Sequence, residues 1–140
     1  MINSRDINQL SPRVHDLAVR FLNEAEKSHI EVIIISTYRD VEYQDYLYAQ
    51  GRTRPGKIIT YAKGGQSFHQ YRCAFDVLPM QGKTPIWNAS DPAYEQLGAI
   101  GKAIGLEWAG DWKKMREKAH FQYTGGLTLS DFQKGKTIQV

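Results

Sequence analysis

The chain has few of the features that stabilise disulfide-rich secreted proteins or membrane proteins. Its 140 residues include one cysteine, Cys73, so no intrachain disulfide can form, which fits folding in a reducing cytoplasm. The longest continuous apolar run, residues 32–35, is far too short to cross a bilayer, so we expect no stable membrane insertion. The N-terminus lacks a basic stretch followed by an apolar run, so we expect no secretory signal there.

Strong charge, internal repeats and low-complexity tracts are also missing. The formal net charge is only +3, and the basic residues are spread along the chain without a long basic run. This mild excess suits an anionic partner such as an acidic polymer, but no recognised motif indicates nucleic-acid binding. Hydrophobic residues make up 41% of the chain and charged residues 24%, which is typical of a folded domain. We therefore expect a single domain over residues 1–140.

Apolar periodicity and turn residues predict an α+β fold with a small sheet. Ser11 and Pro12 are expected to open the first helix, and Asp40 to cap the second. The β-branched run IEVIIIST at residues 30–37 is predicted to be a strand buried on both faces. In chain order the expected elements are a helix at 12–27, a strand at 30–37, a helix at 41–50, a basic glycine-rich loop at 51–66, a strand at 74–78, a connector at 79–90, a helix from 92 that ends at Gly105, strands at 106–108 and 120–123, and a last helix capped by Ser130.

Two residues that bind metals well stand in SFHQYRCAFD, residues 67–76. His69 and Asp76 are seven positions apart, which places them on opposite faces of a strand or about two turns apart on a helix. Neither arrangement allows both to bind one ion at about 2 Å. Shared ligation therefore requires a turn at residues 70–73 and a strand that begins near Ala74. Taken alone, the pair is more simply a loop histidine and a strand-end carboxylate.

A third candidate ligand follows in the stretch REKAHFQY. His120 completes a set of two histidines and one carboxylate, the three-ligand pattern of a catalytic zinc site with a fourth position open for water. Zinc lowers the pKa of bound water toward neutrality, and a free carboxylate nearby can take the proton. Glu117, three residues before His120, is placed for that task. By itself it would be a solvated charge in a lysine-rich run.

A hydrolase also needs a positive or hydrogen-bonding group where negative charge develops on oxygen. Arg39 follows directly after the predicted strand at residues 30–37, where a side chain is held rigidly and can face a cleft. The simpler alternative is a surface ion pair between Arg39 and Asp40 or Glu42, which would contribute little.

In combination, these motifs resemble the zinc D-alanyl-D-alanine carboxypeptidase family, which includes the L-alanyl-D-glutamate endopeptidases of phage endolysins. The motifs are STYRD at 36–40, SFH followed by Asp76, GDW at 110–112 and then ExxH ending at His120. GLEWAGDW at 105–112 and HFQ at 120–122 are most similar to the endolysin branch. The resemblance runs from about residue 30 to 125 and implies a small α+β fold with an antiparallel sheet.

The resemblance also implies a role for each matching residue. His69, Asp76 and His120 would be the zinc ligands, Glu117 the catalytic base, and Arg39 the group that stabilises the oxyanion; Ser67 and Gln44 would support the site. One position departs from the family pattern, because Arg72 stands where the family usually has glycine. Glycine there often marks a positive φ, so we expect either a strained arginine or a different turn, with zinc binding retained.

The expected function is that of a zinc endopeptidase acting on peptidoglycan stem peptides, most simply at the L-Ala–D-Glu bond. We expect a monomeric phage or prophage endolysin without a separate wall-binding domain, made in the host cytoplasm and released through a holin pore to act on the wall. Two alternatives remain open. One is a D-Ala–D-Ala carboxypeptidase or dipeptidase of the same family, and the other is a non-catalytic module in which zinc is structural.

Overall fold

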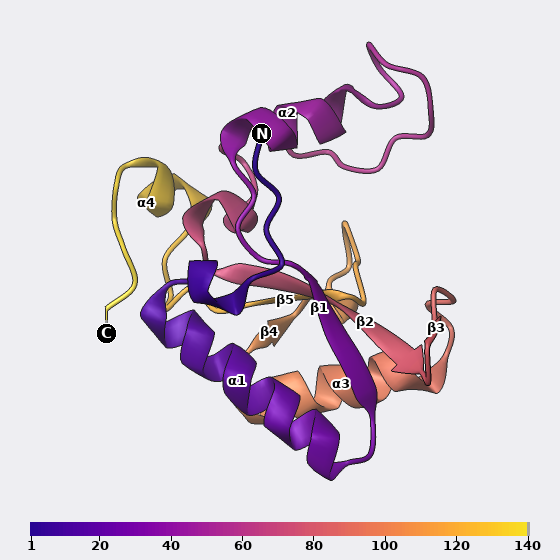
Figure 1. The fold of residues 1–140 in the computed structure, drawn as a ribbon. Helices are drawn as coiled ribbons and strands as arrows, with labels where there is room; N and C mark the ends of the chain where they lie inside the picture. Colours follow the sequence, from indigo (N-terminus) through magenta and orange to yellow (C-terminus); the bar gives the residue numbers. More distant parts are fainter. Residues whose placement is uncertain (140) are drawn as a thin grey trace.

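The computed structural model describes residues 1–139, which form one antiparallel five-stranded sheet with helices around it (Figure 1). The strand order is β1-β2-β5-β4, and β3 pairs with β2. The elements are η1 (Ile7–Gln9), α1 (Pro12–Lys27), β1 (Glu31–Ser36), α2 (Val41–Ala49), η2 (Phe68–Tyr71), β2 (Ala74–Gln81), β3 (Thr84–Pro85), α3 (Pro92–Ala103), β4 (Glu107–Trp108), η3 (Ala109–Asp111), β5 (His120–Gln122) and α4 (Leu129–Gln133). The predicted α+β class with a small antiparallel sheet is confirmed.

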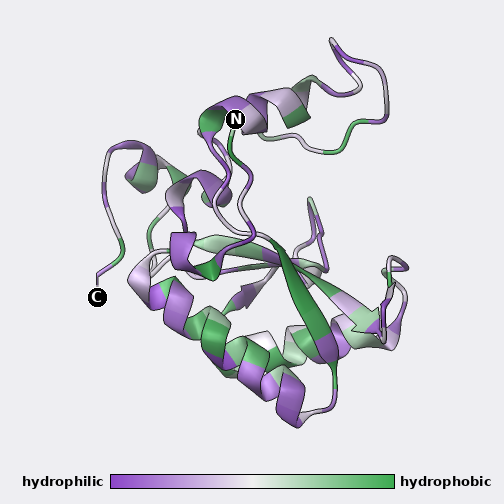
Figure 2. Cartoon of the chain, viewed as in Figure 1, coloured by the Kyte–Doolittle hydropathy of each residue, from purple (hydrophilic) through white to green (hydrophobic). Residues whose placement is uncertain are grey.

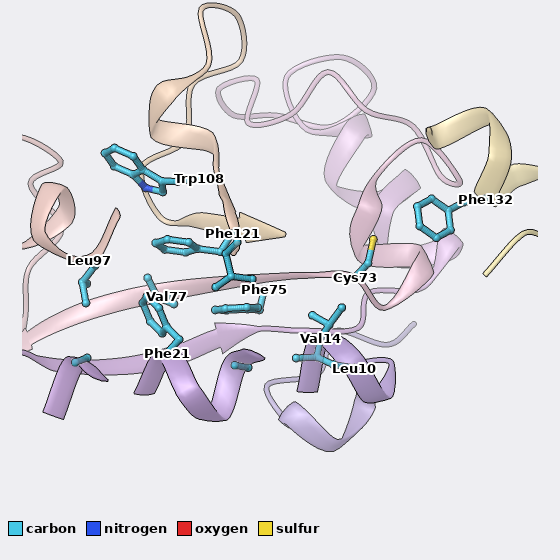
Figure 3. Close-up of a cluster of buried hydrophobic side chains, with 13 residues drawn as sticks. Leu10, Val14, Phe21, Cys73, Phe75, Val77, Leu97, Trp108, Phe121 and Phe132 are labelled. Atoms are coloured by element: carbon cyan, nitrogen blue, oxygen red, sulfur yellow. The ribbon is translucent and has the colours of Figure 1, made fainter. Parts of the chain in front are cut away.

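The main core lies between the sheet and the helices α1 and α3. Figure 2 shows that α1 has a hydrophobic side and a hydrophilic side, as its apolar periodicity requires. Phe21 of α1 packs against Phe75 of β2 and Phe121 of β5, with ring centroids 5.8 and 4.9 Å apart (Figure 3). Full burial of each ring stabilises the fold by roughly 2–3 kcal/mol.

This packing determines where the polar residues of the same strands point. Phe75 pairs with Phe121 across β2 and β5, and the next pair along is Asp76 with His120. Because successive side chains of a strand alternate between its faces, core packing of the two phenylalanines turns Asp76 and His120 toward the opposite face. In Figure 1, α2 and the loop after it lie on that side, away from α1 and α3.

Two glycines allow α3 to approach the sheet closely. A Cβ atom at Gly98 would come within 2.5 Å of the Trp108 ring, and one at Gly101 within 2.4 Å of the Phe121 ring. Both glycines lower the intrinsic helix propensity of α3, but they let it pack directly onto β4 and β5. Within residues 1–139, no helix combines the length and the apolar character needed to cross a membrane.

Several local predictions were wrong. The strand predicted at residues 30–37 is not buried on both faces: β1 is an edge strand, and Ile33 is 42% exposed. Ser11 precedes α1 as expected, but its hydroxyl bonds the Arg72 carbonyl instead of capping the helix. Thr128, not Ser130, caps α4.

The connector predicted at residues 79–90 is also partly wrong, because β2 continues to Gln81 and turns back into β3. A run of apolar residues does not reveal which strand lies at the sheet edge, and a proline at position 79 made the continuation of β2 hard to foresee.

Candidate metal centre

Three elements bring His69, Asp76 and His120 together on the side of the sheet opposite α1. His69 comes from η2, Asp76 from β2 and His120 from β5. The Oδ1 atom of Asp76 lies 3.2 Å from Nε2 of His69 and 3.1 Å from Nδ1 of His120. One ligand atom from each residue lies within 4.8 Å of the others, so a single ion could contact all three.

A turn between His69 and Asp76 solves the geometric problem that the sequence raises. Ser67 caps η2: its hydroxyl accepts from the His69 N–H, and Gln70 bonds back to the Ser67 N–H at 2.9 Å. The chain then leaves η2 through Arg72, which has the left-handed conformation with φ 62°. This single residue reverses the chain so that β2 begins at Ala74 and carries Asp76 back beside His69.

Arg72 therefore keeps the positive φ that glycine would provide, and contacts around it hold it there. Its guanidinium lies over the Tyr38 ring at 3.9 Å and donates to the carbonyl oxygen of Gln9 at 2.9 Å. The backbone N–H of Ser11 donates to the Arg72 carbonyl at 3.0 Å. A left-handed non-glycine residue costs roughly 1–2 kcal/mol, and these contacts offset that cost. Of the two expected outcomes, a strained arginine is the one found.

Each imidazole is oriented through its other ring nitrogen. Nδ1 of His69 lies 2.8 Å from the Thr37 carbonyl oxygen, and Nε2 of His120 lies 2.8 Å from Oε1 of Gln122. A carbonyl oxygen only accepts, so these two nitrogens donate. In the neutral rings the remaining nitrogens, which face Asp76, then present lone pairs. Gln122 was not predicted to be a site residue, although side-chain alternation along the strand predicted at residues 120–123 puts it on the same face as His120.

The charges of the centre depend on one another. Burial would raise the pKa of Asp76, but the neighbouring His69 and His120 outweigh it and hold that pKa below its ordinary value. Burial would likewise lower the pKa of His120, but its hydrogen bond to Asp76 and the negative charge there raise it. Asp76 is therefore an ionised carboxylate, and it stabilises a cation at this point, whether that cation is a proton on imidazole or a metal.

The Arg39 side chain, three residues after the end of β1, also approaches the carboxylate of Asp76. Its Nη2 lies 3.6 Å from Oδ2 of Asp76, and its Nη1 donates to Oε1 of Gln44 at 3.0 Å. Gln44 is buried in α2 and also donates to the Ala62 carbonyl at 2.8 Å. The pairing of Arg39 with Asp40 or Glu42, considered from sequence, does not occur. Within residues 1–139, Nε of Arg39 is a buried donor without a hydrogen-bond partner.

Glu117 lies at the rim of the centre. Its carboxylate is 3.9 Å from Nδ1 of His120, and its side chain is 57% exposed. Glu117, Arg39, His69, Asp76 and His120 all line one cleft of about 550 Å³. The buried residues at the floor can hold an ion, while the exposed carboxylate at the rim is free to exchange protons with water.

The donor set matches zinc. Two imidazole nitrogens and one carboxylate oxygen are the ligands of many catalytic zinc sites, and three protein ligands leave a coordination position open. The hydrogen bonds to Thr37 and Gln122 orient the two rings so that their other nitrogens face Asp76, and metal-binding histidines usually have such an orienting partner.

Two curated relatives resemble the chain over most of its length. The peptidoglycan L-alanyl-D-glutamate endopeptidase CwlK of Bacillus subtilis (strain 168) is 34% identical over 123 residues, which cover 82% of this chain and 74% of CwlK. The L-alanyl-D-glutamate peptidase of Listeria phage A118 is 29% identical over 133 residues, which cover 93% of this chain but only 44% of the phage protein.

Solved structures share the fold at low sequence identity. The L-Ala D-Glu endopeptidase ChiX of Serratia marcescens superposes with a TM-score of 0.63 at 20% identity, covering 94% of this chain and 92% of ChiX. The vancomycin-resistance D,D-pentapeptidase VanY of a VanB-type cassette, solved in complex with Zn(II), superposes with a TM-score of 0.62 at 16% identity. The match covers 99% of this chain and 86% of VanY.

The family comparison covers the region that contains the centre. The sequence model described as D-alanyl-D-alanine carboxypeptidase matches residues 60–123, which include His69, Asp76, Glu117 and His120. The identity to CwlK extends the match over most of the chain. This chain belongs to the D-alanyl-D-alanine carboxypeptidase family of metallopeptidases, the M15 peptidases.

Proposed function

We propose that the chain is a zinc-dependent endopeptidase that cleaves the L-Ala–D-Glu bond of peptidoglycan stem peptides. The observation that carries the proposal is the convergence of His69, Asp76 and His120 in a cleft that also contains Glu117 and Arg39. The choice of bond is supported by the two curated relatives, both of which are L-alanyl-D-glutamate peptidases.

In this proposal Nε2 of His69, Oδ1 of Asp76 and Nδ1 of His120 hold the zinc ion. The fold neighbour solved with Zn(II) supports this choice of metal. Zinc in such a site lowers the pKa of a bound water and polarises a carbonyl group. Asp76 contributes the negative charge that a divalent cation requires. Each imidazole can offer its inner nitrogen to the ion, because its outer nitrogen donates to Thr37 or Gln122.

Glu117 acts as general base and then general acid. Its exposed carboxylate at the cleft rim can take a proton from the attacking water and deliver it to the leaving amine. Arg39 lines the same cleft and supplies positive charge toward the scissile carbonyl oxygen.

Ser67 and Gln44 support these groups, and Ser67 also lines the cleft. Ser67 caps the turn that carries His69, and Gln44 fixes one side of the Arg39 guanidinium. Each therefore acts by holding another side chain in its position.

Mass spectrometry of digested wall material tests the proposal. Zinc-loaded protein is incubated with purified sacculi, and the products are compared with those of Glu117→Gln. Cleavage at L-Ala–D-Glu leaves fragments with a new N-terminal glutamate. Intact stem peptides after prolonged incubation would refute the proposal.

A D-Ala–D-Ala carboxypeptidase is the second candidate, because the matching family carries that description. Both activities use the same centre and differ only in which peptide occupies the cleft. The same digest separates them, since a carboxypeptidase releases free D-alanine and leaves the L-Ala–D-Glu bond intact.

The biological role that we propose is that of a single-domain, monomeric phage or prophage endolysin over residues 1–140. Its similarity to the Listeria phage peptidase supports this role, although the chain spans less than half of that protein. In this role the enzyme leaves the host cytoplasm through a holin pore. Co-expression with and without a holin tests this, with lysis expected only when both proteins are present.

A further inference from the structure

An excess of positive charge is concentrated around the basic glycine-rich loop that the sequence predicts at residues 51–66. Residues 46–66, here called the basic arm, contain four of the eighteen lysines and arginines and none of the fifteen acidic residues. The arm therefore carries a formal charge of +4. The remaining residues, with fourteen basic and fifteen acidic side chains, carry −1. Figure 1 shows this segment projecting beyond the sheet as the end of α2 and the loop after it.

Among the described residues, no acidic side chain pairs with these four charges. Within residues 1–139, none of the four basic side chains of the arm forms an ion pair. The Arg52 guanidinium lies over the Tyr48 ring at 3.7 Å, and the Arg54 guanidinium lies over the Tyr46 ring at 3.6 Å. Arg54 also donates to the Tyr46 carbonyl at 2.7 Å. Rings and carbonyls orient the guanidinium groups but do not neutralise them, so the arm presents oriented, uncompensated positive charge.

The arm has a defined shape although most of it is neither helix nor strand. The side chain of Gln50 donates to the Lys57 carbonyl at 3.1 Å and so closes the outer turn. Asp45 of α2, which directly precedes the arm in the chain, accepts from the Gly64 N–H at 2.7 Å. It therefore ties the end of the loop to the helix instead of pairing with a cation. A preorganised loop loses little conformational entropy when it binds a partner.

The inner edge of the arm is also a wall of the catalytic cleft. Ile59, Thr60, Tyr61 and Ala62 line the same cleft as the metal-binding residues. Ile59 and Tyr61 are 50% and 66% exposed. Arg52 donates to the Thr60 carbonyl at 3.1 Å, so at least one cation of the arm lies beside this wall of the cleft.

We propose that the basic arm is the electrostatic docking surface for the acidic peptide strands of peptidoglycan that flank the bond to be cut. This inference rests on the proposed function. A glutamate residue in a peptide keeps one carboxylate free, so a polymer of glutamate-containing stem peptides carries repeated negative charge. Guanidinium and ammonium groups bind such carboxylates, and repeated contacts along a polymer raise its local concentration at the cleft.

Binding to insoluble sacculi tests the docking surface apart from catalysis. The zinc-loaded Glu117→Gln protein is sedimented with sacculi from which teichoic acid has been removed, and is compared with the same protein carrying R52Q, R54Q, K57Q and K63Q. We expect the arm variant to bind at least about tenfold more weakly at about 0.05 M salt. The difference should shrink at about 0.5 M salt, where exposed charges are screened.

A matched control removes the same charge elsewhere. Arg5, Arg20, Lys83 and Lys134 are two arginines and two lysines that are exposed, line no part of the cleft and form no ion pair within residues 1–139. Changing all four to glutamine should leave binding to sacculi within about twofold. Equal loss in both variants would mean that net charge alone matters and would overturn the docking surface.

A charge-preserving variant separates lost charge from a damaged arm. R52K with R54K removes the guanidinium contacts to the tyrosines but keeps both charges, so binding at low salt should be largely retained. If this variant bound as weakly as the glutamine variant, loop shape and not charge would be responsible, and the proposal would be overturned.

Two further outcomes would assign the arm to another partner. An effect seen only with sacculi that retain teichoic acid would identify a phosphate polymer. An effect seen with anionic phospholipid vesicles but not with sacculi would identify a membrane. Either result overturns the proposal. Stem-peptide hydrolysis by the active enzyme is measured separately: absence of cleavage would refute the proposed function while leaving the comparison of binding interpretable.

Discussion

The metal centre and the basic arm line the same cleft but differ in how their charges are compensated. At the centre, His69, Asp76 and His120 are largely buried, and every ring nitrogen has a partner within hydrogen-bonding distance. On the arm, four cations are paired with no carboxylate in the described chain. Buried, compensated charges hold atoms in fixed positions, whereas exposed, uncompensated charges attract a partner over distance. Changes at the centre should therefore alter chemistry and metal affinity with little dependence on salt.

The largest effect is expected from removing a ligand of the centre. His69→Ala leaves Asp76 and His120 without their third partner, so the zinc content should fall from about one per chain to near zero. Hydrolysis should fall by about a thousandfold or more. Metal analysis of the purified variant, beside wild type, measures the first effect. A full complement of zinc in His69→Ala would contradict the ligand assignment.

Glu117→Gln should separate chemistry from metal binding. The carboxylate is exposed and is not needed to hold the ion, so zinc content should remain unchanged while hydrolysis falls by roughly 10²- to 10⁴-fold. The same preparation serves both measurements. Undiminished hydrolysis would remove Glu117 from the mechanism, and lost zinc would make it a ligand instead.

Gln122 tests whether orientation of His120 matters beyond the ligands themselves. Gln122→Leu leaves the buried Nε2–H of His120 without an acceptor, so zinc affinity should fall by about 10- to 100-fold. Gln122→Glu retains an acceptor and should keep or increase the affinity. Competition with a chromophoric chelator measures both variants. Equal affinities in the two would show that this hydrogen bond does not orient the ligand.

The smallest effect concerns Arg72, whose strain the sequence anticipated. Arg72→Ala keeps the left-handed conformation and loses the contacts to Tyr38 and Gln9, whereas Arg72→Gly loses the contacts but relieves the strain. The alanine variant should therefore be less stable than the glycine variant by about 1 kcal/mol. Urea unfolding of both proteins checks this order. A more stable alanine variant would mean that the turn relaxes to another conformation.

Local sequence patterns predicted many of the helices and strands, because interactions between residues close in sequence determine where these elements begin and which faces they present. Helix α1 begins at Pro12, and Asp40 caps α2 by accepting from the Tyr43 N–H. Alternation along β5 placed His120 and Gln122 on one face. The need for a turn at residues 70–73 followed from the length of ion–ligand bonds, and η2 with Arg72 provides it.

The features that the sequence did not predict depend on contacts between residues that are far apart in the chain. The register that sets Asp76 opposite His120 joins residues 44 positions apart, and no local pattern determines it. The edge position of β1 depends on the order of strands in the sheet. The carbonyl of Thr37 as acceptor for His69 likewise appears only when the chain is folded.

The close packing of the Phe121 ring on Gly101 links the interior of the protein to the metal centre. Phe121 lies between His120 and Gln122 in the chain, so the ring that anchors β5 in the core also sets the position of one ligand and its hydrogen-bond acceptor. The strand cannot leave the core without carrying His120 away from Asp76. Thermal melting and release of the ion should therefore coincide as one cooperative transition, and the melting temperature should rise with free zinc concentration.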